Sequence, residues 1–171
     1  MESSTLRHPY RAGFEFEKKY HGCAQCAVSA LYTVFPEHTN PDVFRAASGL
    51  GGGVGLSCKG HCGALSGAVM VLSQLFGREL NAIEDLEKKR TYAFRLANEM
   101  VDHFIVEFGT VFCGEIQDKL LGRRFDLWDP DDKQSFEDAG AHDPHCPSVV
   151  GKAVQWASEL IKRESKQTAD D

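Results

Sequence analysis

The sequence predicts an all-α fold: a compact single domain, residues 1–171, with about five helices and one glycine-rich loop. Apolar residues recur at helical spacing in several long stretches, and no stretch has the alternating apolar and polar residues of a half-buried strand. Glycine is concentrated between Ser48 and Gly67, where eight of the 16 glycines lie. Because glycine permits unusual backbone conformations, this segment is expected to form an irregular, tightly folded loop.

The first long helix is expected from about Gly13 to Phe35, because apolar residues recur there at roughly helical spacing and Pro36 ends the pattern. A short helix should follow from Pro41 to about Ser48. Asn40 is a favourable N-cap for it, and proline suits the first helical position.

Two longer helices are expected after the glycine loop. The first runs from Gly63 to Phe76, and its small residues would allow another helix to approach closely. The second runs from about Ala82 to Phe108 and ends at Gly109. Its predicted buried face consists of Leu86, Ala93, Leu96, Met100, Val101 and Phe104. The segment 111–121 is expected to be helical as well.

The C-terminal part combines a polar stretch with a last helix. Residues 122–145 are acidic and contain proline without a sustained period, which predicts a long polar excursion anchored by Phe125, Leu127, Trp128 and Phe136. Pro147 should open the last helix, which has an apolar stripe. The polar ends, residues 1–12 and 163–171, are expected to be flexible.

The composition is that of an ordinary globular protein, with 42% apolar and 26% charged residues. A net charge of −6 and the absence of long basic runs argue against a nucleic-acid partner. No apolar run approaches the roughly 20 residues that span a bilayer, and the N-terminus has no apolar signal segment. These features predict a cytoplasmic protein, in which clustered cysteines bind metal or carry out redox chemistry more often than they form structural disulfides.

Two pairs of cysteines are closely spaced among the six in the chain. Cys23 and Cys26 are three residues apart, and Cys58 and Cys62 are four apart. Cys62 should lie at a helix N-terminus, where free amides and the helix dipole favour thiolate. The spacing does not match a zinc ribbon, and Ala27 stands where c-type haem attachment needs histidine. Spacing alone therefore leaves metal binding, thiol chemistry and structural thiols open.

Four segments together resemble a bacterial and archaeal family that is named for its C_GCAxxG_C_C cysteine pattern and is described as redox-active. They are GCAQ at 22–25, CGALSG at 62–67, CGE at 113–115 and HCP at 145–147. The resemblance extends from about Tyr20 to Leu160 and implies a redox role. It also implies that the site cysteines are Cys23, Cys62, Cys113 and Cys146, with Cys26 and Cys58 as possible alternates.

Several chemistries fit such a site. Four thiolates are the usual ligands of an iron–sulfur cluster, which favours an electron-transfer protein that works with a redox partner protein. Metal-free thiol–disulfide chemistry is the first alternative, carried by the pair Cys58 and Cys62 or the pair Cys23 and Cys26. A zinc-stabilised structural or binding module is the second alternative.

The sequence identifies no catalytic residues, so it leaves open whether the protein is an oxidoreductase. It also leaves open whether the chain forms a homo-oligomer. Three histidines, His21, His61 and His145, lie within two residues of a cysteine in the predicted set. Each is a candidate ligand or hydrogen-bond donor at the site. Each is also an ordinary polar residue at a helix end, and nothing in the sequence distinguishes the two roles.

Overall fold

The computed structural model describes residues 8–170, the last three of them by backbone alone, and over this range the chain is all-α with no strand. The all-α prediction is therefore confirmed. The predicted number of about five helices is wrong, because the described range contains eight α-helices. They are α1 (Pro9–Tyr20), α2 (Cys23–Val34), α3 (Pro41–Ala46), α4 (Gly63–Phe76), α5 (Lys89–Phe108), α6 (Cys113–Leu121), α7 (Pro130–Asp138) and α8 (Cys146–Asp170).

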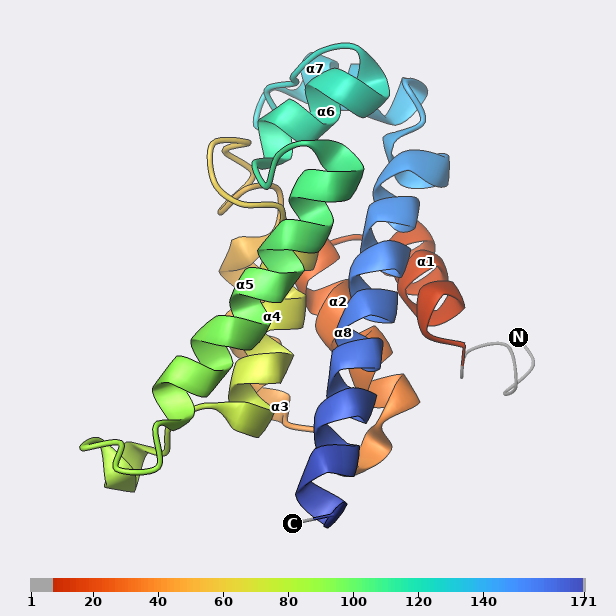
Figure 1. Cartoon of the computed structure of the whole chain (residues 1–171). Helices are drawn as coiled ribbons and strands as arrows, with labels where there is room; N and C mark the ends of the chain where they lie inside the picture. The colour runs from red at the N-terminus through yellow and green to blue at the C-terminus, as the bar shows by residue number, and fades with distance from the viewer. Residues whose placement is uncertain (1–7, 171) are drawn as a thin grey trace.

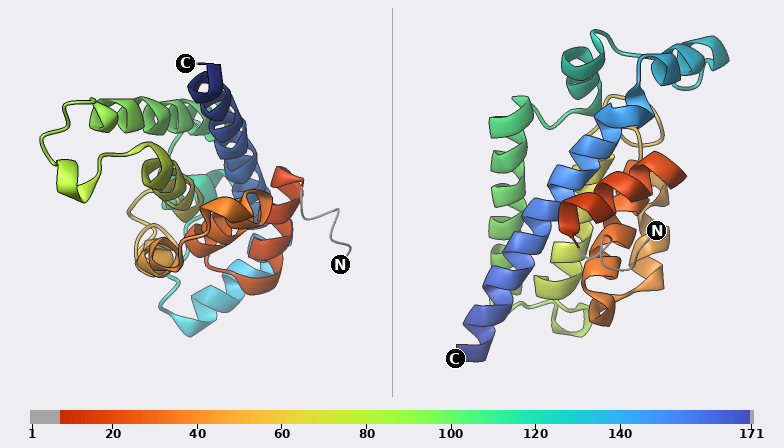
Figure 2. Two further views of the ribbon diagram at one scale, coloured as in Figure 1. Left: turned by 90° about the horizontal axis from the view of Figure 1, so that it is seen from below. Right: turned by 90° about the vertical axis from the view of Figure 1, so that its right-hand side faces the viewer.

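The hydrophobic core lies between α1, α2, α4, α5 and α8, and α5 packs against α4 and α8 (Figure 1). Helix α8 runs along almost the full length of the molecule (Figure 2). Leu31, Leu72, Phe104 and Val154 from four of these helices are completely or almost completely buried in the core. Helices α6 and α7 and the glycine loop gather at the end of the molecule where α8 begins (Figure 1).

The predicted long first helix is interrupted after Tyr20. His21 and Gly22 both adopt positive φ, at 58° and 85°, which a continuing α-helix does not allow. Gly22 makes this conformation available at low cost, and the chain starts α2 at Cys23. The break matters for function, because it places Cys23 at a helix N-terminus rather than in the middle of a helix.

Helix α5 begins seven residues later than predicted. Residues 80–88 form a short 3₁₀-helix and turns, in which Asp85 and Lys88 have positive φ. The Asp85 carboxylate accepts hydrogen bonds from the backbone N–H of Arg90 at 3.1 and 3.2 Å, which caps the helix. Leu86, predicted on the buried face, is 85% exposed, because it lies in this turn.

The polar segment 122–145 contains α7 and an irregular turn, Ala141–His145, in which Asp143 has extended backbone angles. Phe125, Leu127 and Phe136 are buried in a second small cluster around Cys58. Trp128 is not a buried anchor: it is 72% exposed, and its indole N–H donates a hydrogen bond to the carbonyl of Gly55 at 2.9 Å. The segment thus covers the glycine loop.

Glycines set the closest helix contacts of the core. A Cβ atom at Gly13 of α1 would lie 2.8 Å from the carbonyl oxygen of Val150 on α8. A Cβ atom at Gly67 of α4 would collide with the carbonyl of Ala24 on α2. The predicted role of the small residues of α4 in close packing is therefore confirmed.

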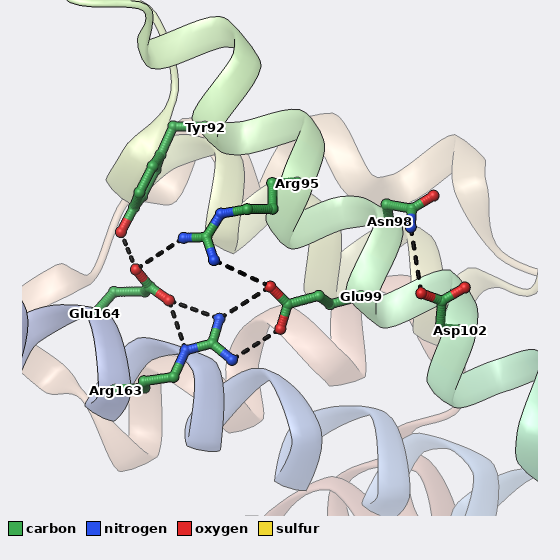
Figure 3. A network of polar contacts seen from close by, with 7 residues as sticks. All are labelled: Tyr92, Arg95, Asn98, Glu99, Asp102, Arg163 and Glu164. Carbon is green, nitrogen blue, oxygen red and sulfur yellow. Dashed lines mark hydrogen bonds and ion pairs between the residues drawn. The ribbon is translucent and has the colours of Figure 1, made fainter.

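A polar network joins α5 to α8 (Figure 3). Its centre is Glu164, whose side chain is fully buried and pairs with Arg95 at 3.2 Å and with Arg163 at 2.6 Å. Tyr92 donates a hydrogen bond to the same carboxylate. Arg163 also pairs with Glu99 of α5 at 2.8 Å. A buried carboxylate is tolerated in this position because cationic partners surround it.

Replacing Glu164 by alanine is expected to lower the free energy of unfolding by about 2 kcal/mol, because two arginines and a tyrosine lose their buried partner. Urea unfolding followed by circular dichroism would measure this change. Glu159→Ala on the exposed side of the same helix is the matched control, with an expected change within about 0.5 kcal/mol. Equal effects of the two substitutions would contradict a stabilising role for the network.

Candidate functional site

The four predicted site cysteines each lie at the start of an α-helix. Cys23, Cys113 and Cys146 are the first residues of α2, α6 and α8, and Cys62 is the N-cap of α4. The first turn of a helix has backbone N–H groups without helical partners and carries the positive end of the helix dipole. Four such ends favour negative charge on the four sulfur atoms.

These four cysteines line one cavity of about 190 Å³, called the cysteine cavity below. Gly51 and Gly52 of the glycine loop form part of its wall. Apolar side chains form much of the remainder, among them Leu127, Phe136 and Val149. Among the described residues that line this cavity, neither Cys26 nor Cys58 is included. The structure thus brings together the four cysteines that the resemblance implied.

Backbone hydrogen bonds hold the starts of α4 and α6 side by side. The N–H of Cys62 donates to the carbonyl of Val111 at 2.8 Å, and the N–H of Cys113 donates to the carbonyl of Gly60 at 3.0 Å. His61 and Phe112 form an isolated antiparallel bridge between these contacts. The glycine loop therefore folds as predicted from its composition, and it fixes the relative positions of two site cysteines.

The start of α4 also packs tightly against the start of α2. A Cβ atom at Gly63 would collide with the sulfur atom of Cys23 and would lie 3.0 Å from the carbonyl oxygen of Leu50. Only glycine leaves room for Cys23 at this position. The glycine that follows Cys62 in the CGALSG segment thus has a steric role at the site.

Burial opposes the ionisation of the site cysteines. Burial has the larger effect and raises the pKa of the Cys62 thiol to about 11, although the neighbouring amides of Ala64 and Leu65 lower it. Burial also raises the pKa of Cys23 and of Cys146 well above the ordinary value, and the charge of Glu17 adds to the effect. Four thiolates would therefore need a compensating positive charge near neutral pH.

Cys58 and Cys26 have other partners. The Gln117 amide N–H donates to the Cys58 sulfur at 3.2 Å and to the Cys113 sulfur at 3.6 Å. A hydrogen bond from Cys113, aided by Gln117, lowers the pKa of Cys58 to about 7 despite its burial. Cys26 is 3% exposed, and its thiol donates to the carbonyl of His21 at 3.0 Å.

Of the three candidate histidines, His21 lines the cysteine cavity. His61 is exposed and its ring packs on Phe112 with a centroid distance of 5.5 Å. His145 is partly buried and is not among the described lining residues.

Sequence reasoning missed five polar residues of the cavity wall, Glu17, Gln117, Lys133, Glu137 and His142. Glu17 lies four residues after Gly13, on the buried face of α1. A carboxylate on the apolar face of a predicted helix is a signal that could have identified it. The others lie on α6, α7 and the turn before α8. No local pattern links these elements to the cysteines.

The fold and this cavity define an all-helical protein in which four cysteines, one buried and three partly buried, line one cavity. The family model described as "Putative redox-active protein (C_GCAxxG_C_C)" matches residues 21–160. The chain belongs to this family, as its resemblance predicted. Comparison with curated proteins and with solved structures found no match. Within the described residues, no helix combines the length and the apolar character that crossing a membrane requires.

Proposed function

We propose that Cys23, Cys62, Cys113 and Cys146 bind an iron–sulfur cluster and that the protein transfers electrons to or from a partner protein. The observation that carries this proposal is the convergence of four cysteines, each at a helix N-terminus, on one cavity. Four cysteine thiolates are the common ligand set of such clusters. When bound, the cluster supplies one-electron transfer.

The donor set and its surroundings fit this group. Burial raises the pKa of Cys23, Cys62 and Cys146, so the thiolates become favourable when a cationic centre binds among them. Leu127 and Phe136 limit the access of water to the site. Both features are typical of a site that keeps its ligands ionised and its metal shielded from solvent.

The chain also supplies hydrogen bonds that would tune the site. The amides of Gly52 and Ala24 lower the pKa of Cys23, and those of Ala64 and Leu65 lower the pKa of Cys62, which partly offsets the effect of burial. N–H donors stabilise negative charge on ligand sulfur atoms and so raise a reduction potential. These amides belong to helix starts and to the glycine loop, so the fold sets their positions independently of the redox state of the site.

A second candidate function rests on the contact between Cys58 and Cys113. The lowered pKa of Cys58, about 7, makes it the better nucleophile of this pair. In thiol–disulfide exchange both thiols would lose their protons, one sulfur–sulfur bond would form, and a disulfide partner would be reduced to two thiols. The candidate pair differs from those expected from sequence spacing, which were Cys58 with Cys62 and Cys23 with Cys26.

Protein purified without oxygen is expected to be brown, to contain iron and acid-labile sulfide, and to bleach on reduction. A visible spectrum together with iron, zinc and sulfide determination on the same sample measures this. Colourless protein in which zinc is bound by the four cysteines would instead favour the structural module. Colourless protein that stays colourless after reconstitution with iron and sulfide would overturn the cluster proposal and favour the dithiol.

A further inference from the structure

A second group of possible metal ligands lies on the wall of the cysteine cavity. His21, Glu137 and His142 each offer one nitrogen or oxygen atom, and within the described chain these atoms lie within 4.8 Å of one another. The Nδ1 atom of His142 is 2.7 and 2.9 Å from the two carboxylate oxygens of Glu137. The rings of His21 and His142 stack with centroids 3.8 Å apart.

A buried carboxylate faces this group. Glu17 is 2% exposed and lines the same cavity, and its Oε1 atom lies 3.8 Å from Nε2 of His142. Its Oε2 atom is buried and has no hydrogen-bond partner within the described structure. A buried carboxylate oxygen without a partner is costly, and a bound cation would compensate for it. Glu17 thus indicates, independently of the other three side chains, that a cation binds in this part of the cavity.

We propose that His21, Glu137 and His142 bind a divalent transition-metal ion and that the buried Glu17 carboxylate beside them helps to balance its charge. Two neutral imidazoles and two carboxylates would balance the charge of such an ion. Imidazole nitrogen combined with carboxylate oxygen favours Zn²⁺ or Fe²⁺ over Mg²⁺ and Ca²⁺, which prefer oxygen ligands alone. The site would lie beside the four cysteines, and its existence does not depend on an iron–sulfur cluster.

The simpler explanation is an ion pair between Glu137 and a protonated His142. That pair would account for the short contact between these two side chains. It would leave the Oε2 atom of Glu17 unpartnered, and it gives His21 no role in the group. A bound ion accounts for the cluster of His21, Glu137 and His142 and supplies a positive charge beside Glu17. Metal titration distinguishes the two explanations.

The test is a titration with Co²⁺ of the full-length variant in which Cys23, Cys62, Cys113 and Cys146 are replaced by alanine. The expected result is one bound ion with the absorption bands of nitrogen and oxygen ligands and without sulfur-to-cobalt charge transfer. Calorimetry with Zn²⁺ should give the same stoichiometry. A correctly folded variant that binds neither ion would overturn the proposal.

Matched substitutions in that background locate the site. His142→Ala and Glu137→Gln should each weaken Co²⁺ binding more than tenfold. His61→Ala and Asp138→Asn, which change an exposed histidine near the cavity and an exposed acid next to Glu137, should leave it unchanged. Equal binding by all four variants would show that the ion sits elsewhere and would overturn the assignment.

If the four-alanine variant does not fold, the wild-type protein and its His142→Ala variant provide the measurement. The substitution should then remove one Co²⁺ ion per chain while the sulfur-to-cobalt absorption persists. An unchanged number of bound ions would contradict the proposal. Because iron and sulfide content are determined separately, loss of this site and loss of the proposed cluster give different results.

Discussion

Replacing Cys146 by serine is expected to abolish cluster binding, with at least a tenfold drop in acid-labile sulfide per chain after anaerobic reconstitution. Cys146 is the first residue of α8 and lines the cysteine cavity. A hydroxyl group is a much poorer ligand for iron than a thiolate. Iron and sulfide determination and the visible spectrum of the reconstituted variant measure the effect.

Cys26→Ser is the matched control for this experiment. Cys26 is equally a helical cysteine close to the site, but its thiol donates to the carbonyl of His21, and a serine hydroxyl can make the same bond. The control should keep the iron content of the parent protein. Cys146→Ser protein with the iron content and spectrum of the parent would remove Cys146 from the ligand set.

Replacing Gly63 by alanine is expected to disturb both the fold and the site. The added methyl group would collide with the Cys23 sulfur and would also lie 3.1 Å from the backbone nitrogen of Ala24. Overpacking at a rigid backbone contact costs about 3 kcal/mol in the free energy of unfolding. The displaced Cys23 should also prevent cluster loading. Urea unfolding of the metal-free protein and iron determination measure the two effects independently.

Gly49→Ala is the control. The added methyl group would have no close contact within 4 Å, and Gly49 does not have a positive φ. It should change the free energy of unfolding by no more than about 0.5 kcal/mol and leave iron binding intact. A Gly63→Ala protein that is as stable and as rich in iron as this control would contradict the steric role assigned to Gly63.

Apolar periodicity in the sequence was sufficient to predict the fold class and the positions of some helices. The predicted helix from Gly63 to Phe76 coincides with α4, because an unbroken apolar stripe and a terminal glycine define it locally. The same criterion missed the break at His21 and Gly22. That break is a matter of backbone conformation, and the apolar pattern continues across it. The start of α5 was missed for a similar reason: the Asp85 cap acts through a hydrogen bond rather than through hydrophobicity.

The sequence by itself determined the all-α class and, through the family's motifs, the four cysteines of interest. The tertiary structure decided that these four share a cavity, whereas Cys26 and Cys58 contact other groups. Glu17, Glu137 and His142 came together only in the folded chain, because they lie on α1, α7 and the turn before α8. Helical periodicity describes contacts within one helix. The meeting of distant helix ends depends on how the helices pack, which local spacing does not encode.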